Sequence, residues 1–119
     1  MKYILLIYVD EAKGAQMAKE VGPTQMSAPY LAYTEALKKA GAYLGGDRLQ
    51  PTNVATSVKT ANGKTQVLNG PYAETREQLG GYYMIEAEDL DAALAWAARC
   101  PAASYGTVEV RPIWAMQAS

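Results

Sequence analysis

The residues with the most varied side-chain chemistry lie between positions 69 and 83, in the run NGPYAETREQLGGYY. This run places Glu74, Arg76 and Glu77 between a Gly-Pro turn and a glycine pair, with tyrosines at both edges. Carboxylates beside phenolic hydroxyls can hold a small polar molecule through hydrogen bonds. We therefore interpret the run as a candidate binding site. The alternative is an ordinary loop in which Tyr72 packs, Glu74 caps a turn and the other charges are solvated.

Two arginines elsewhere in the chain could contact an anionic ligand, because a guanidinium group pairs well with carboxylate or phosphate. Arg48 could equally form a salt bridge with Asp47 or Glu86. Arg111 and Glu109 point the same way on a predicted strand and would need partners if that strand were central; an ion pair or a rim position is the simpler interpretation. The candidate ligand-binding residues are Arg48, Asn69, Tyr72, Glu74 and Arg111.

The chain has no histidine and one cysteine, Cys100. The lack of histidine excludes Ser-His-Asp, Cys-His and facial-triad chemistry. No spacing of Asp and Glu matches a carboxylate metal site, so we expect neither a metal nor a cofactor. Cys100 has no adjacent base or helix N-terminus in the sequence and is interpreted as a core residue. These patterns assign no catalytic residue.

Composition limits the class of protein. The 119 residues fit one domain spanning residues 1–119, and half of them are hydrophobic. The net charge of −1 and the absence of a Lys/Arg cluster argue against nucleic acid as the main partner. The apolar stretch at residues 3–9 is too short to span a bilayer and lacks the features of a signal peptide. We therefore expect a cytoplasmic protein without a membrane partner, and the single cysteine agrees with a reducing compartment.

The first half of the chain predicts a strand followed by helical structure. Residues 2–9 are apolar at successive positions, which predicts a strand covered on both faces. Residues 10–25 are polar and alanine-rich, so we expect a short helix near residues 12–19 or a flap. Ser27 is a suitable cap for a longer helix with Pro29 in its first turn, and Gly41 suits its end.

The second half predicts strands around one further helix. Asn62-Gly63 is a strong signal for a two-residue hairpin turn. Asp89 can cap a helix over residues 90–99, with Leu90, Ala93, Leu94 and Ala97 on its inner face. The predicted strands are residues 42–44, 54–60, 64–68, 81–87 and 107–114.

This order of elements predicts an α+β protein of the ferredoxin-like split βαβ plan, with an antiparallel sheet enlarged by a hairpin. In that plan both helices cover one face of the sheet. Because residues 2–9 are apolar on both sides, the other face must also be buried. A second copy of the chain is the simplest cover, so the pattern predicts a homodimer that forms a dimeric α/β barrel.

Four segments carry a resemblance to a known family. They are NGPYAETREQLGGYYMIE (69–86), MKYILLIY (1–8), DLDAALAWAARCPAA (89–103) and YGTVEVRPIW (105–114). Together they resemble the DGPF branch of the YCII-related proteins. The resemblance implies a dimeric α+β barrel from a bacterium, with many members encoded beside extracytoplasmic-function sigma factors and with no defined activity. The fold it implies is also similar to that of small antibiotic-biosynthesis monooxygenases and muconolactone isomerases.

The chain departs from that family in two respects. The Asp and Phe of the DGPF signature are replaced by Asn69 and Tyr72. The His-Asp pair associated with the broader YCII group has no histidine here, and Tyr30 is expected near its place. The resemblance therefore transfers no catalytic role.

We expect a homodimer that binds a small polar or anionic molecule in a cleft beside residues 69–77. One alternative is a cofactor-free isomerase or oxygenase, with Tyr30, Tyr72 or Glu74 as acid or base. The other is an interaction module linked to an extracytoplasmic-function sigma factor.

Overall fold

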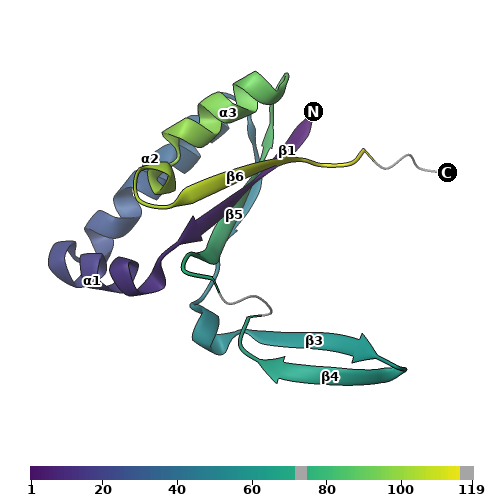
Figure 1. Ribbon diagram of the computed structural model, residues 1–119. Helices are drawn as coiled ribbons and strands as arrows, with labels where there is room; N and C mark the ends of the chain where they lie inside the picture. Colours follow the sequence, from purple (N-terminus) through teal and green to yellow (C-terminus); the bar gives the residue numbers. More distant parts are fainter. Residues whose placement is uncertain (72–74, 116–119) are drawn as a thin grey trace.

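A four-stranded antiparallel sheet organises the chain, with its strands in the order β2-β5-β1-β6 (Figure 1). The computed structural model describes residues 1–71 and 75–115. Its strands are β1 (Lys2–Val9), β2 (Tyr43–Arg48), β3 (Thr56–Ala61), β4 (Lys64–Asn69), β5 (Gln78–Glu86) and β6 (Thr107–Pro112). Its helices are α1 (Glu11–Val21), α2 (Pro23–Lys39) and α3 (Leu90–Arg99), with short 3₁₀ turns η1 (Thr52–Val54) and η2 (Pro101–Ser104). This arrangement confirms the predicted ferredoxin-like α+β fold.

The core lies between one face of the sheet and helices α2 and α3. Strand β1 presents alternate residues to this face, and Leu5 is fully buried. From the helices, Leu37 of α2 and Ala93 of α3 are also at 0% exposure. Burial of these side chains supplies the main stabilisation of the fold, at roughly 25 cal/mol per Å² of apolar surface.

Helix α2 begins one turn before the predicted start. Gly22 adopts φ 83° at the junction with α1, and Pro23 occupies the first turn, where its missing N–H costs nothing. Ser27 is therefore inside the helix, and its hydroxyl donates to the carbonyl of Thr24 at 3.2 Å. The expected cap at Ser27 is wrong, and Pro29 lies in the helix interior instead of its first turn.

The segment over residues 10–25 is helical over most of its length. Asp10 caps α1 by accepting a hydrogen bond from the Lys13 amide at 3.1 Å. The predicted short helix therefore exists, but it extends to Val21.

Two of the predicted strands are longer in the structure. Strand β2 continues past the predicted residues 42–44 through Gly45-Gly46 to Arg48, and β5 begins at Gln78, before the predicted residues 81–87, so Gly80-Gly81 lies inside it without positive φ values. Gly46 and Gly81 allow β2 and β5 to lie close together, because a Cβ on Gly81 would lie 2.9 Å from the carbonyl oxygen of Asp47. Strand β6 is at the edge of the sheet and Glu109 and Arg111 are exposed, which confirms the rim position that the sequence analysis preferred for them.

Helix α3 has the predicted bounds, from the Asp89 cap to Arg99. The Asp89 carboxylate caps the helix by accepting a hydrogen bond from the Ala92 amide at 2.9 Å. Its inner face is narrower than predicted, because Leu90 and Leu94 are 47% and 46% exposed. Only the alanine row of the helix is buried against the sheet.

Strands β3 and β4 form a separate two-stranded arm. Asn62 and Gly63 adopt φ values of 52° and 76°, which confirms the predicted hairpin turn. The arm extends from the end of the sheet, away from α1 and α2 (Figure 1). Nearly all its residues are exposed, in contrast to the main sheet.

Candidate functional site

The helices lie on one face of the sheet, and no described helix lies on the other (Figure 1), where Ile4, Leu6 and Met84 are half-buried in the single chain. Residues directly opposite each other in an antiparallel pair share a face, so the register defines the rows across it. One row contains Asp47, Tyr82, Leu6 and Glu109 in strand order. The next row contains Gly45, Met84, Ile4 and Arg111. We call this surface the open face; it is apolar in the centre and charged at its edges.

Hydroxyl groups pair with carboxylates along the open face. Tyr82 donates to Asp47 Oδ2 at 2.8 Å, and Tyr8 donates to Glu109 Oε1 at 3.4 Å. The hydrogen bond to Asp47, followed by its charge, raises the pKa of the Tyr82 hydroxyl. The carboxylate of Asp47 thus opposes loss of the Tyr82 proton, and the hydroxyl is the donor in this pair. These pairs present both hydroxyl groups and carboxylates to a molecule that binds on the open face.

The loop that leads into β5 is tied to the same end of the sheet. Thr107 donates to Glu77 Oε1 at 2.7 Å, which fixes the loop to the start of β6. Gln78 accepts a hydrogen bond from the Glu11 amide at 3.2 Å. The sequence analysis placed Glu77 in the candidate run, with a solvated charge as the alternative; in the structure its carboxylate is hydrogen-bonded to Thr107 at the start of β6.

A second tie holds the base of the arm. The Glu11 carboxylate accepts from both the amide and the hydroxyl of Thr52, at 2.9 and 2.8 Å. At the other strand of the arm, the Gly70 amide donates to the Ala55 carbonyl at 2.7 Å. The two strands of the arm therefore leave the body from one hydrogen-bonded corner.

The predicted site residues lie in three places. Arg111 belongs to the open face, level with Ile4. Arg48, opposite Gly81, belongs to the helix-covered side at the exposed end of β2, so the register does not bring the two arginines together within one chain. Asn69 ends β4 at the base of the arm and is exposed. Tyr72 and Glu74 fall outside the described residues.

The sequence analysis missed Tyr82, Asp47 and Tyr8 as a polar set. Their signal is the period-2 alternation of each strand, which places Tyr8 with Leu6 and Ile4 on one side of β1. Pairing between distant strands was needed to add Asp47. That pairing is a property of the topology and cannot be derived from spacing alone.

Buried tyrosines surround the single cysteine. Cys100 is 2% exposed, and burial raises the pKa of its thiol, which confirms the interpretation as a core residue. Burial likewise raises the pKa of Tyr30, whose hydroxyl also pairs with that of Tyr105. A tyrosine with a raised pKa is protonated near neutral pH, so Tyr30 is not suited to act as a base.

Of the other aromatic residues, Tyr33 and Trp96 pack together, whereas Trp114 is exposed in the single chain. Tyr33 donates to the carbonyl of Trp96 at 2.6 Å and packs edge-on against its ring. The Arg99 guanidinium lies 4.4 Å from the centroid of the Trp96 ring. Trp114 is 91% exposed, so within this chain it is not a core residue.

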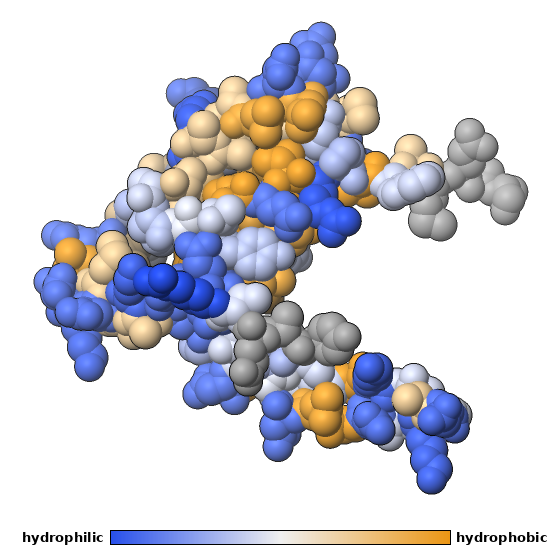
Figure 2. Space-filling model, in the orientation of Figure 1, coloured by the Kyte–Doolittle hydropathy of each residue, from blue (hydrophilic) through white to orange (hydrophobic). Residues whose placement is uncertain are grey.

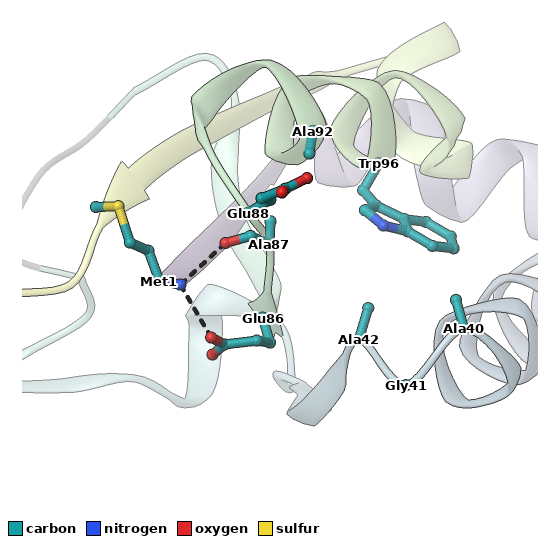
Figure 3. A pocket seen from close by; sticks show the side chains of 9 residues that line it. All are labelled: Met1, Ala40, Gly41, Ala42, Glu86, Ala87, Glu88, Ala92 and Trp96. Atoms are coloured by element: carbon teal, nitrogen blue, oxygen red, sulfur yellow. Dashed lines mark hydrogen bonds and ion pairs between the residues drawn. The ribbon is translucent and has the colours of Figure 1, made fainter.

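A shallow groove of about 380 Å³ lies beside the N-terminus of α3 (Figure 3). Its polar group Glu86 is occupied by the α-amino group of Met1 at 2.9 Å, and that amine also contacts the Ala87 carbonyl at 3.0 Å. The remaining lining residues are mostly alanine and glycine, with Glu88 and Trp96 at the sides. The groove contains none of the candidate ligand-binding residues.

Within residues 1–71 and 75–115, no group of three or more Cys, Asp or Glu residues is arranged to hold a metal ion. None of the helices in these ranges is long and apolar enough to cross a membrane.

Comparison with known proteins gives the family. The model of the YCII-related domain matches residues 1–117. The chain belongs to the YCII-related family. An uncharacterized protein of Rhizobium meliloti (strain 1021) is 39% identical over 118 residues, which cover 95% of this chain and 92% of that protein. This YCII-related chain is therefore matched along nearly its whole length by a relative of similar size, whose printed name states no activity.

Proposed function

We propose that this YCII-related protein is a homodimer whose two copies pack their open faces together. The observation that carries the proposal is the apolar centre of the open face, formed by Ile4, Leu6 and Met84 on the two central strands. An apolar sheet surface facing water is unfavourable and typically marks an interface. A second copy presents the same surface, so a two-fold contact buries both at once.

The edges of the open face support a two-fold contact. Arg111 lies at one edge, and carboxylates lie at both edges in the adjacent row, Asp47 on β2 and Glu109 on β6. A two-fold rotation can place the arginine of one copy near a carboxylate of the other. Such pairs at a rim favour the correct orientation more than they add affinity.

We propose that the dimer binds a small polar or anionic molecule at the end of the sheet beside residues 69–77. The hydrogen-bonded hydroxyls and carboxylates there offer both donors and acceptors. Arg48, Asn69, Tyr72, Glu74 and Arg111 are the residues that we propose to contribute, the arginines through an anionic group on the ligand. Binding on a dimer would allow Arg111 of one copy to act beside the loop of the other.

Two finer assignments accompany this proposal. We place the chain in the DGPF branch, on the likeness of residues 69–86 to its signature, and we expect it to act in the cytoplasm. Asn69 in place of the signature Asp retains hydrogen-bonding capacity and lacks the charge.

Native mass spectrometry of the protein purified from its own host tests the binding proposal. The wild-type dimer is expected to carry a reproducible additional mass. Tyr72→Ala and Glu74→Ala are expected to lose that mass, whereas Glu20→Ala, at an exposed position of α1, keeps it. An additional mass unchanged in both site variants would place the ligand elsewhere, and an empty wild-type dimer would contradict binding.

A further inference from the structure

The β3–β4 arm has two chemically different faces. The register pairs Val58 with Val67 and Thr60 with Thr65, so one face of the arm is uncharged and rich in β-branched residues. The other face carries Lys59 opposite Gln66. If both faces of the arm were exposed to water in the functional protein, there would be no reason for the charged residues to lie on one face only.

The uncharged face is exposed to solvent in the single chain. Val58 and Val67 are 65% and 64% exposed, although they are directly opposite each other on the arm. Figure 2 shows apolar side chains along the arm and a broad open space between the arm and the rest of the molecule. The face is therefore available to a partner.

The arm is not expected to be stable without a partner surface. An isolated two-stranded hairpin is marginally stable at best in water, and this one projects as six-residue strands of about 20 Å. The radius of gyration is 16.4 Å, whereas a compact chain of this length has about 13.5 Å. The single chain is therefore less compact than a typical chain of this length. This is expected if the projecting arm is covered only when the chain assembles with a partner.

Charge and position indicate what covers it. The arm carries Lys59 and Lys64 and no carboxylate, so it contributes +2 to a chain of net charge −1 and leaves −3 for the rest. Both lysines lie on the face of the arm opposite Val58 and Val67, so this charge difference attracts the arm to a second body from a distance, while packing of the uncharged face buries no charge. The arm also extends away from the helix layer, toward the side on which the sheet is bare (Figure 1).

We propose that the β3–β4 arm is an exchange arm: its uncharged face packs against a second copy of this chain, which receives it and returns its own. The inference rests on the proposed dimer, because the copy seated on the open face is the one that the arm reaches. Each arm leaves its body from the corner that holds Asn69 and Gly70. Exchange therefore places this corner, and the candidate residue Asn69 with it, beside the partner subunit.

A matched pair of charge substitutions tests the arm. Val67→Glu places a carboxylate on the uncharged face, whereas Gln66→Glu places the same charge on the opposite face, beside Lys59. Val67→Glu is expected to raise the dimer dissociation constant at least about tenfold, because the charge would be buried without a partner. Gln66→Glu is expected to change it less than about twofold. Sedimentation velocity over a dilution series measures both.

Hydrogen exchange of the wild-type protein gives a test without a variant. Amides of β3 and β4 are expected to exchange slowly above the dissociation constant and fast below it, while amides of β1 remain slow in both. Val67→Glu dimers as tight as the wild type, or arm amides that exchange equally at both concentrations, would overturn the proposal. A wild-type protein that is monomeric at every concentration would overturn the proposed dimer as well, which separates the two failures.

Discussion

Tyr82 on β5 donates a hydrogen bond to Asp47 on β2 at 2.8 Å, and the two residues are direct cross-strand partners on the open face. The pair connects an inner strand to one edge of the sheet. Across the same row, Glu109 occupies the other edge and receives the Tyr8 hydroxyl. Both edges of the open face are therefore polar and hydrogen-bonded, with apolar side chains between them.

The pKa of Tyr82 reports on this pair. Replacement of Asp47 by Asn removes the charge that opposes phenolate formation, so the Tyr82 pKa is expected to fall toward its ordinary value of 10.0. Carbon-13 NMR of ring-labelled tyrosine over an alkaline titration measures the change. Asp91→Asn, an equal charge change on α3, is the control. An unchanged Tyr82 titration in Asp47→Asn would show that the pair does not form in solution.

Alkaline pH is expected to destabilise the protein through its buried tyrosines. Burial raises the folded-state pKa of Tyr30, Tyr33 and Tyr83, so the unfolded state releases these protons first. The free energy of unfolding is therefore fully retained below the ordinary tyrosine pKa and falls as the pH rises above about 10. Urea denaturation at about pH 8 and about pH 11 measures the loss.

Lysine deprotonation contributes to the same range of pH, so a variant is needed as control. Tyr33→Phe removes one of the titrating groups and is expected to show a smaller loss between the two pH values than the wild type, although it is less stable at pH 8 for want of the hydrogen bond to Trp96. Equal losses in the two proteins would assign the alkaline effect to other groups.

Leu37 is expected to be a principal core residue of α2. It is at 0% exposure, so Leu37→Ala leaves a cavity and should cost about 2–5 kcal/mol of unfolding free energy. Leu31→Ala, on the same helix at 66% exposure, should cost less than about 0.5 kcal/mol. Denaturation with urea measures both. Similar costs at the two positions would contradict the packing of α2 against the sheet.

Gly81 is expected to resist substitution because of close strand approach. A Cβ there would lie 2.9 Å from the Asp47 carbonyl oxygen, so Gly81→Ala must displace β2 and should cost about 1–3 kcal/mol. Gly45 has no atom within 4 Å of the corresponding position, and Gly45→Ala should be neutral or stabilise by up to about 1 kcal/mol. Equal effects of the two substitutions, measured by urea denaturation, would contradict the β2–β5 pairing.

The elements predicted best from sequence are those with local signals. Helix α3 has its predicted bounds because Asp89 caps it and Pro101 follows it. The hairpin turn at Asn62-Gly63 is confirmed for the same reason, since only these two residues need positive φ there. The alternation of β1 was sufficient to predict that both of its faces carry apolar side chains.

What could not be predicted depends on contacts between distant segments. The start of α2 is set by Gly22 and Pro23 at a junction with α1, and the sequence offered Ser27 as an equally good cap. The sequence analysis preferred a rim position for the charges of β6, but which strand lies beside it follows only from the sheet order. For the site, Arg111 was identified as a candidate, but its place beside Ile4 on the open face required the register.

Sedimentation equilibrium of the wild-type protein and of Leu6→Glu tests the central claim, which is that a second copy covers the open face. Leu6 lies on β1 between Tyr82 and Glu109, away from the helix-covered core. We predict a wild-type dimer and a Leu6→Glu variant that is folded, by circular dichroism, and largely monomeric because it would bury an unpaired charge. A monomeric wild-type protein at every concentration, or a Leu6→Glu dimer as tight as the wild type, would contradict the claim.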